Sequence, residues 1–194
     1  MKWIIPVLLV ACDGDSKTTD TSADTVVDVP FELTSDAFAE GETIPTVHEC
    51  GPPLSATGPG DNVSPSLTWT AGPEGTASYA VVVRDRDAKI AQFPEGIIHW
   101  VVYNIPADAL ALPEGVADGA DVAAVSGALQ AEIKGSGYYG YFGPCSPNSV
   151  NTYEFTVHAM GDAEIDTDGD ASESNVAAIV EASALESASL SGES

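Results

Sequence analysis

A single histidine interrupts an apolar run near the middle of the sequence. The run GIIHWVVYNIP covers residues 96–106. Strand alternation places His99 on the same face as Val101 and Ile105. At the wall of a cavity an imidazole can bind a polar ligand, because it exchanges hydrogen bonds and changes charge near neutral pH. The alternative is a histidine sealed in the core and satisfied by one hydrogen bond.

Three other features could line a cavity together with His99. Asp85 lies near the end of the strand-like run SYAVVVRDRDA, on the same face as Tyr79. The turn GPCSP, residues 143–147, is tight and exposed, so it could present backbone N–H groups. Tyr153 follows at the start of the next strand. An acid, a histidine, N–H donors and a phenol together can line a small polar pocket.

The sequence lacks the patterns of common catalytic and metal sites. It has no G-x-S-x-G, H-E-x-x-H, C-x-x-C or P-loop motif, and no nucleophile is evident beside Asp85 and His99. The other histidines, His48 in a loop and His158 on the outward face of a strand, are expected at the surface. The acidic run DTDGD, residues 166–170, has its glycine too early for a calcium loop. We therefore expect no enzyme activity, no metal and no cofactor.

Short strands must position these side chains. Apolar runs bounded by glycine and proline predict strands over residues 78–88, 97–106 and 151–161. Residues 170–190 predict a helix, whose narrow apolar stripe contains Val176, Ile179, Val180 and Ala184. Many short strands with one terminal helix are typical of a mainly β fold. We expect a β-sandwich with a C-terminal helix and small helical additions.

The first residues, MKWIIPVLLVAC, predict an export signal. The apolar run after the lysine is too short to span a bilayer, which needs about 20 residues. Because it ends in the lipobox-like LVAC, we predict a lipoprotein signal peptide over residues 1–11 and lipidation of Cys12; the alternative is an ordinary secretory signal. Residues 12–29 are predicted to be an acidic flexible tether, and residues 30–194 the folded domain. We expect an exported bacterial lipoprotein, anchored in a membrane and facing the periplasm or cell exterior.

Charge and cysteine content restrict the partners and the compartment. The formal net charge of −24 disfavours nucleic acids and anionic lipid headgroups as partners, because their phosphates would be repelled. Apart from Cys12, the sequence has two cysteines, Cys50 and Cys145. In an exported protein an even pair predicts a disulfide, worth about 4–5 kcal/mol for a loop of this length. The alternative is two buried thiols.

The order of the motifs resembles that of the phosphatidylethanolamine-binding protein family, which includes the Raf kinase inhibitor-like proteins, and its small bacterial branch in particular. The similarity runs from about Phe31 to Gly192. Six pieces occur in family order: FELTSDAFAEGETIP, NVSPSLTW, SYAVVVRDRDA, HWVVYNIP, GPCSP and ALESASLSGES. The resemblance implies the family's sandwich fold, with the last piece in the terminal helix.

The resemblance also implies a ligand pocket for phosphate-like anions and phosphorylated headgroups. Its residues match two acids, a histidine before tryptophan, a turn and a tyrosine of the family: Asp85, Asp87, His99, Gly143, Pro144, Cys145, Pro147 and Tyr153. In this arrangement His99 forms the pocket wall, Asp85 can orient its ring, and backbone amides supply further donors.

The sequence departs from the family pattern near this pocket. Arg86 and Lys89 stand where the family's first box has prolines, and Asn151 stands where the family has a second histidine. Asparagine can donate a hydrogen bond but carries no charge. Either Arg86 and Lys89 restore the positive charge that the second histidine would supply, or the pocket no longer binds the ligand and the domain keeps only the fold.

The leading functional prediction is a lipid-anchored extracytoplasmic protein that binds a small anionic or phosphate-bearing ligand. It would be a monomer or a dimer, with its membrane contact through Cys12. The alternative is a protease inhibitor or interaction module that keeps the fold without a ligand, since some relatives inhibit kinases or proteases. Enzyme activity ranks last among the functional hypotheses, because a shared fold does not show that a protein catalyses a reaction.

Overall fold

The computed structural model describes residues 29–133, 135–146 and 148–194. The predicted signal peptide, Cys12 and all but the last residue of the predicted tether lie outside the described residues, as does Pro147. Within the described residues, no helix has the length and apolar character needed to span a bilayer.

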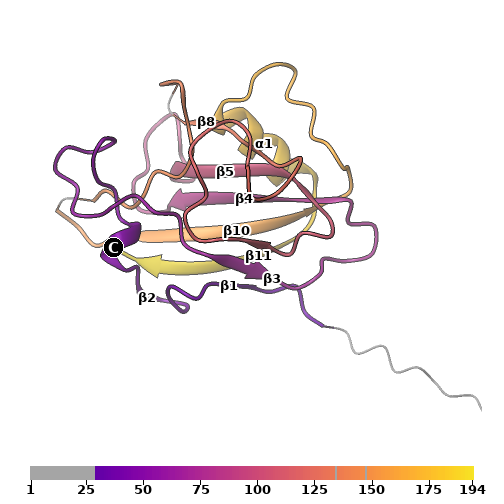
Figure 1. Ribbon diagram of the computed structural model, residues 1–194, viewed down its shortest axis with the longest axis horizontal. Helices are drawn as coiled ribbons and strands as arrows, with labels where there is room; N and C mark the ends of the chain where they lie inside the picture. Colours follow the sequence, from indigo (N-terminus) through magenta and orange to yellow (C-terminus); the bar gives the residue numbers. More distant parts are fainter. Residues whose placement is uncertain (1–28, 134, 147) are drawn as a thin grey trace, which may run out of the picture.

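Two packed β-sheets form the body of the protein (Figure 1). The larger sheet has six strands, in the order β2 (Glu42–Thr43), β11 (Ala184–Glu193), β10 (Thr152–Met160), β4 (Ser78–Asp85), β5 (Ile97–Pro106) and β7 (Leu129–Gln130). The smaller sheet contains β1 (Leu33–Thr34), β3 (Leu67–Trp69) and β6 (Ala111–Leu112). The remaining elements are the hairpin β8 (Glu132–Ile133) and β9 (Tyr138–Tyr139), the 3-10 turn η1 (Thr46–His48) and the helix α1 (Glu173–Ser183). The predicted sandwich is confirmed.

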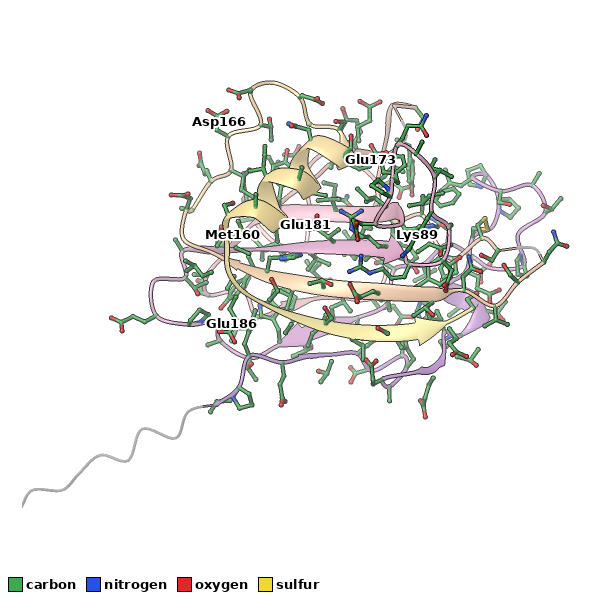
Figure 2. The ribbon with its side chains drawn as sticks, turned by 180° about the vertical axis from the view of Figure 1, so that it is seen from behind. Lys89, Met160, Asp166, Glu173, Glu181 and Glu186 are labelled. Atoms are coloured by element: carbon green, nitrogen blue, oxygen red, sulfur yellow. A yellow bond between two sulfur atoms is a disulfide. The ribbon has the colours of Figure 1, made fainter. Side chains whose placement is uncertain are left out.

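The central strand β4 is buried on both faces, which explains the apolar run from Tyr79 to Val83 in its middle. Val81 and Val83 belong to the core between the two sheets. Val82, between them in the chain, packs on the outer face of the large sheet in a second cluster with Val176 and Val180 of α1. Figure 2 shows α1 lying across this outer face. The large sheet therefore separates two apolar layers.

The C-terminal segment differs from its prediction. The helix ends at Ser183, and Ala184–Glu193 form β11, which pairs antiparallel with β10 along nearly its whole length. Ser187 and Ser189 alternate with Ala188 and Leu190, and the latter two pack toward the core between the sheets. Serine-rich sequence has modest helix propensity, so backbone pairing with a long neighbouring strand decides the structure here.

Close packing at the end of β11 leaves no room for a side chain at Gly192. A Cβ atom there would lie 2.6 Å from Cγ1 of Ile44 and 2.8 Å from Cε2 of Phe38. We expect Gly192→Ala to lower the free energy of unfolding by about 1–3 kcal/mol through overpacking, measured by urea denaturation. In the control Gly161→Ala, the new methyl would meet Leu185 at 3.6 Å, an ordinary contact. Equal stability of the two variants would contradict this packing argument.

Candidate functional site

A β-bulge in β5 places His99 and the following Trp100 on the same side of the large sheet, toward the core between the sheets. Along the pairing of β4 with β5, Val83 lies opposite Trp100 and Arg84 lies opposite Ile98, so His99 is the extra residue. Bulges redirect side chains and reverse the alternation beyond them. Val101 therefore packs against α1, and the prediction that it shares a face with His99 and Ile105 is wrong.

The ring of His99 is held by its neighbours from two other segments. Its Nδ1 lies 2.7 Å from the carbonyl oxygen of Phe142. The Tyr153 ring stands perpendicular to the imidazole at a centroid distance of 5.2 Å. Because a carbonyl only accepts hydrogen bonds, Nδ1 carries the proton, and Nε2 of the neutral ring is an acceptor.

A hollow of about 350 Å³ lies beside this ring. It opens between the end of β4, the start of β5 and the segment that precedes β10. Polar and sulfur-bearing side chains in its wall include Asp85, His99, Cys145, Ser146, Ser149 and Tyr153. The structure thus brings the acid, the histidine, part of the predicted turn and the tyrosine to one cavity. Only 4% of His99 is exposed, so the ring forms part of a wall and does not project into solvent.

Asp85 forms part of this wall at the last residue of β4, where it is 3% exposed. Its Oδ1 accepts hydrogen bonds from the backbone N–H groups of Asp87, at 3.0 Å, and Ala88, at 2.9 Å. The amide of Asn151 donates to both carboxylate oxygens, at 3.1 and 2.8 Å. Asn151, the departure from the family pattern, is therefore the side chain that positions Asp85. Its own Oδ1 accepts from the Ser149 hydroxyl at 2.7 Å.

Three residues of the first box do not contribute to the pocket as predicted. Asp87 is exposed, and its Oδ2 accepts a hydrogen bond from the backbone N–H of Thr152 at 2.8 Å. It does not line the hollow, so it supports the strand end instead of contacting a ligand. The guanidinium of Arg86 pairs with Glu154 on the outer face of the sheet. The prediction that Arg86 restores the positive charge of the pocket is thus wrong. Lys89 is exposed and does not line the hollow either.

The predicted Gly-Pro-Cys turn is held by the long loop after β2. Cys50 and Cys145 form a disulfide with their Cα atoms 5.3 Å apart, and the backbone N–H of Cys50 donates to the carbonyl of Pro144 at 2.8 Å. A Cβ on Gly143 would lie 2.3 Å from the carbonyl oxygen of His48, so only glycine allows this approach. These contacts fix the wall that carries Cys145 against the loop.

Two backbone N–H groups expected to serve a ligand are used inside the protein. The N–H of Gly143 donates to Oδ1 of Asn62 at 2.8 Å, and the N–H of Cys145 donates to the Tyr153 hydroxyl at 3.2 Å. Asn62, which has φ +58°, also donates to the carbonyl of Tyr141. The sequence analysis missed Asn62 as a structural clamp. Its signals are a residue type that tolerates positive φ and its place at the start of NVSPSLTW.

The Tyr153 hydroxyl lies between the turn and Asp85. Burial is the largest cause that raises the pKa of Tyr153, and the nearby Asp85 carboxylate raises it further. Hydrogen bonds from Ser146 and Cys145 lower the pKa and offset part of this effect. The Ser146 hydroxyl lies 3.0 Å away. The phenol therefore stays protonated near neutral pH and can donate a hydrogen bond.

The other two histidines are buried, contrary to the prediction. His48 is 2% exposed, and its Nδ1 lies 2.7 Å from the carbonyl of Val63. His158 is 6% exposed, with Nδ1 2.8 Å from the Ser187 hydroxyl. Its strand position does face away from the core between the sheets, but this outer face is covered beside α1. An outward face is exposed only where no helix covers it.

The sequence of this chain matches a known protein family. The profile described as phosphatidylethanolamine-binding protein matches residues 34–194. The chain belongs to this family. The UPF0098 protein YbhB of Escherichia coli (strain K12) is 38% identical over 162 residues, which cover 82% of this chain and 97% of YbhB. The crystal structure of E. coli YbcL superposes with a TM-score of 0.73 at 33% identity, covering 85% of this chain and 98% of YbcL.

One relative bears on the predicted anchor. The putative lipoprotein LppC of Mycobacterium tuberculosis (strain ATCC 25618 / H37Rv) is 34% identical over 133 residues. The match covers 68% of this chain and 56% of LppC. One protein similar to this chain is therefore named as a lipoprotein.

The disulfide is expected to contribute strongly to stability because it closes a loop across 95 positions. Replacing Cys50 and Cys145 together by serine should lower the free energy of unfolding by about 2–5 kcal/mol. Urea denaturation measures the change. A reducing agent should destabilise the wild type similarly and leave the double variant unaffected. An unchanged wild type after complete reduction would contradict this expectation.

His158 should make stability depend on pH. Burial is the largest cause that lowers its pKa from 6.5 to about 4. Between these values the unfolded chain binds more protons than the folded one, so stability is present above the upper value and falls as pH decreases through the window. The loss is at most roughly 3–4 kcal/mol, since each pKa unit corresponds to about 1.4 kcal/mol.

The variant His158→Gln isolates this contribution from the many carboxylates that also titrate in acid. We expect its unfolding free energy to decrease less than that of the wild type between the two pH values. Chemical denaturation at a series of pH values measures both curves. Parallel curves would show that His158 titrates alike in the folded and unfolded states.

Proposed function

We propose that this protein is a lipid-anchored extracytoplasmic binding protein whose hollow beside His99 takes a small anionic or phosphate-bearing ligand. The observation that carries the proposal is the 350 Å³ hollow, because it has a buried imidazole, a phenol and two serine hydroxyls in one wall. A few convergent polar groups in a concave site are typical of small-molecule pockets. Membership of the phosphatidylethanolamine-binding protein family supports the phosphate chemistry.

Binding without turnover is part of the proposal. Among the described residues of the wall, the serine hydroxyls have partners that do not activate them: Ser146 contacts the Tyr153 phenol, and Ser149 donates to Asn151. The sulfur of Cys145 is in a disulfide. Covalent catalysis needs a nucleophile hydrogen-bonded to a base, and these contacts do not supply one.

Three observations support the anchored, extracytoplasmic location. The LVAC sequence at residues 9–12 has the form of a lipobox, and the similar protein LppC is named a putative lipoprotein. The disulfide is also typical of oxidising compartments outside the cytoplasm. Labelling with a radioactive fatty acid in a bacterial host tests the anchor, and Cys12→Ser should abolish the label.

Titration with phosphate and phosphoethanolamine tests the ligand pocket. Both should shift the NMR resonances of His99 and Tyr153, and His99→Gln should weaken binding about tenfold or more, by removing a hydrogen bond in a buried site. His158→Gln, on the opposite face of the large sheet, is the matched control and should bind as the wild type does. Saturating ligand without any shift at His99 or Tyr153 would refute the pocket and favour an interaction module.

A further inference from the structure

A second hollow lies on the outer face of the large sheet, away from the core between the sheets. Its volume is about 280 Å³, and its wall is formed by α1 and the strands β4, β10 and β11. Both arginines of the chain, Arg84 and Arg86, line it. Glu154 and Glu181 line it as well, and Figure 2 looks onto this face and labels Glu181 on α1. None of these four residues lines the hollow beside His99, so the two sites are separate.

The charges that line this outer hollow add up to zero. Two guanidinium groups stand against two carboxylates, and the imidazole of His158 is neutral near pH 7 because burial, the largest cause, lowers its pKa to about 4. A ligand with a net charge is attracted by one kind of group and repelled by the other. The protein's net charge of −24 also repels a free anion, and salt screens its long-range attraction for a free cation. The outer hollow therefore suits a ligand that carries one positive and one negative charge.

Each of the two ion pairs leaves hydrogen-bonding groups for such a ligand. Arg86 donates through Nε and Nη2 to Oε1 of Glu154, and through Nη1 to a backbone carbonyl. Arg84 binds Oε1 of Glu181 and a second backbone carbonyl in the same way. Because each Nη atom carries two hydrogens, N–H groups remain on both guanidiniums. Within the part of the chain that the structure describes, no donor reaches Oε2 of either glutamate.

The buried imidazole of His158 is an independent sign of a polar guest. His158 lines the outer hollow and is 6% exposed, and its Nε2 has no hydrogen-bond partner among the described residues. A buried polar atom without a partner is destabilising, so a group that reaches it is held there. The side chains of Glu181 and Arg86 in the same wall are each 38% exposed and can move to admit a ligand group to Nε2.

The surroundings of these groups favour an organic ligand over a metal ion. In the described ranges, no three histidine, cysteine or acidic side chains are placed to hold a metal. A smaller hollow of about 140 Å³ adjoins the outer hollow along the Arg84–Glu181 pair, and its wall includes Phe93, Pro94 and Ile98. An aliphatic group that enters this smaller hollow is removed from water, which is favourable.

We propose that the two adjoining hollows bind a free aliphatic amino acid. Its ammonium group binds the Oε2 atoms of Glu154 and Glu181, and its carboxylate binds the remaining N–H groups of Arg86. Its side chain packs against Phe93 and Ile98. This site is independent of the hollow beside His99 and does not rest on the function proposed for that hollow.

Leucine and two of its derivatives test the need for both charges. N-acetylleucine lacks the ammonium group, and leucinamide lacks the carboxylate. In NMR titrations of the wild-type protein, leucine should shift the resonances of His158 and Ile98. Each derivative should bind about tenfold more weakly or worse, because it loses charged hydrogen bonds in a partly buried site. Glycine should also bind about tenfold more weakly, because it has no side chain to bury.

The variant Arg86→Gln assigns the carboxylate contact. Leucinamide has no carboxylate to lose, so the preference for leucine over leucinamide should fall toward unity in this variant. Lys89→Gln is the matched control, because it removes the same charge three positions away, outside both hollows, and should leave the preference unchanged. If Arg86→Gln does not fold, Glu181→Gln on α1 serves instead, and it should reduce the preference for leucine over N-acetylleucine.

The possible outcomes separate this site from the hollow beside His99. Saturating leucine without a shift at His158 would overturn the proposal and leave the outer hollow to water. Shifts at His99 and Tyr153 in place of His158 would move the amino acid to the other hollow and equally contradict it. Equal binding of leucine and its two derivatives would show that the charges do not select the ligand. A failure of phosphate to bind beside His99 leaves these expectations unchanged.

Discussion

One extra residue in β5 places the imidazole of His99 and the indole of Trp100 on the same side of the large sheet. Without the bulge, the residues after Ile98 would alternate regularly, and Trp100 and Val102 would exchange faces with Val101. Trp100 is fully buried in the core between the sheets, where its indole N–H donates to Gln130 at 2.7 Å. The apolar packing of β5 on both faces thus holds the bulge in place. It fixes His99 next to Tyr153 and Phe142.

The side of the hollow that carries Cys145, Ser146 and Ser149 depends on covalent and polar links between distant segments of the chain. Asn62 joins the loop after β2 to Gly143, and the disulfide joins the same loop to Cys145. The wall is therefore built from residues that lie about 80–95 positions apart in the sequence. Because short loops without such links are mobile, a wall of this kind needs them to present Ser146 and Ser149 at fixed positions. Preorganised groups lose less entropy when a ligand binds.

The sequence predicted the features that depend on local pattern or on several motifs in order. The apolar runs of β4 and β5 and the alternation of β10 identified the central strands, and six motifs in register identified the fold. Features that depend on tertiary context were missed. Alternation cannot reveal the bulge at His99 because the extra residue is visible only against Val83 and Arg84 of the partner strand. Likewise, His158 is buried on the face where α1 packs against β10, and β11 depends on pairing with β10.

The position of β11 within the large sheet has a consequence for how the protein is made. This strand lies between β10 and β2, and its pairing with β2 joins Gly192 to Glu42 across the sequence. A ribosome-bound chain that lacks residues 184–193 leaves β10 with an open edge. This edge of β10 is therefore covered only after residues 184–193 have been synthesised, and contacts as distant in sequence as that between Gly192 and Glu42 form slowly.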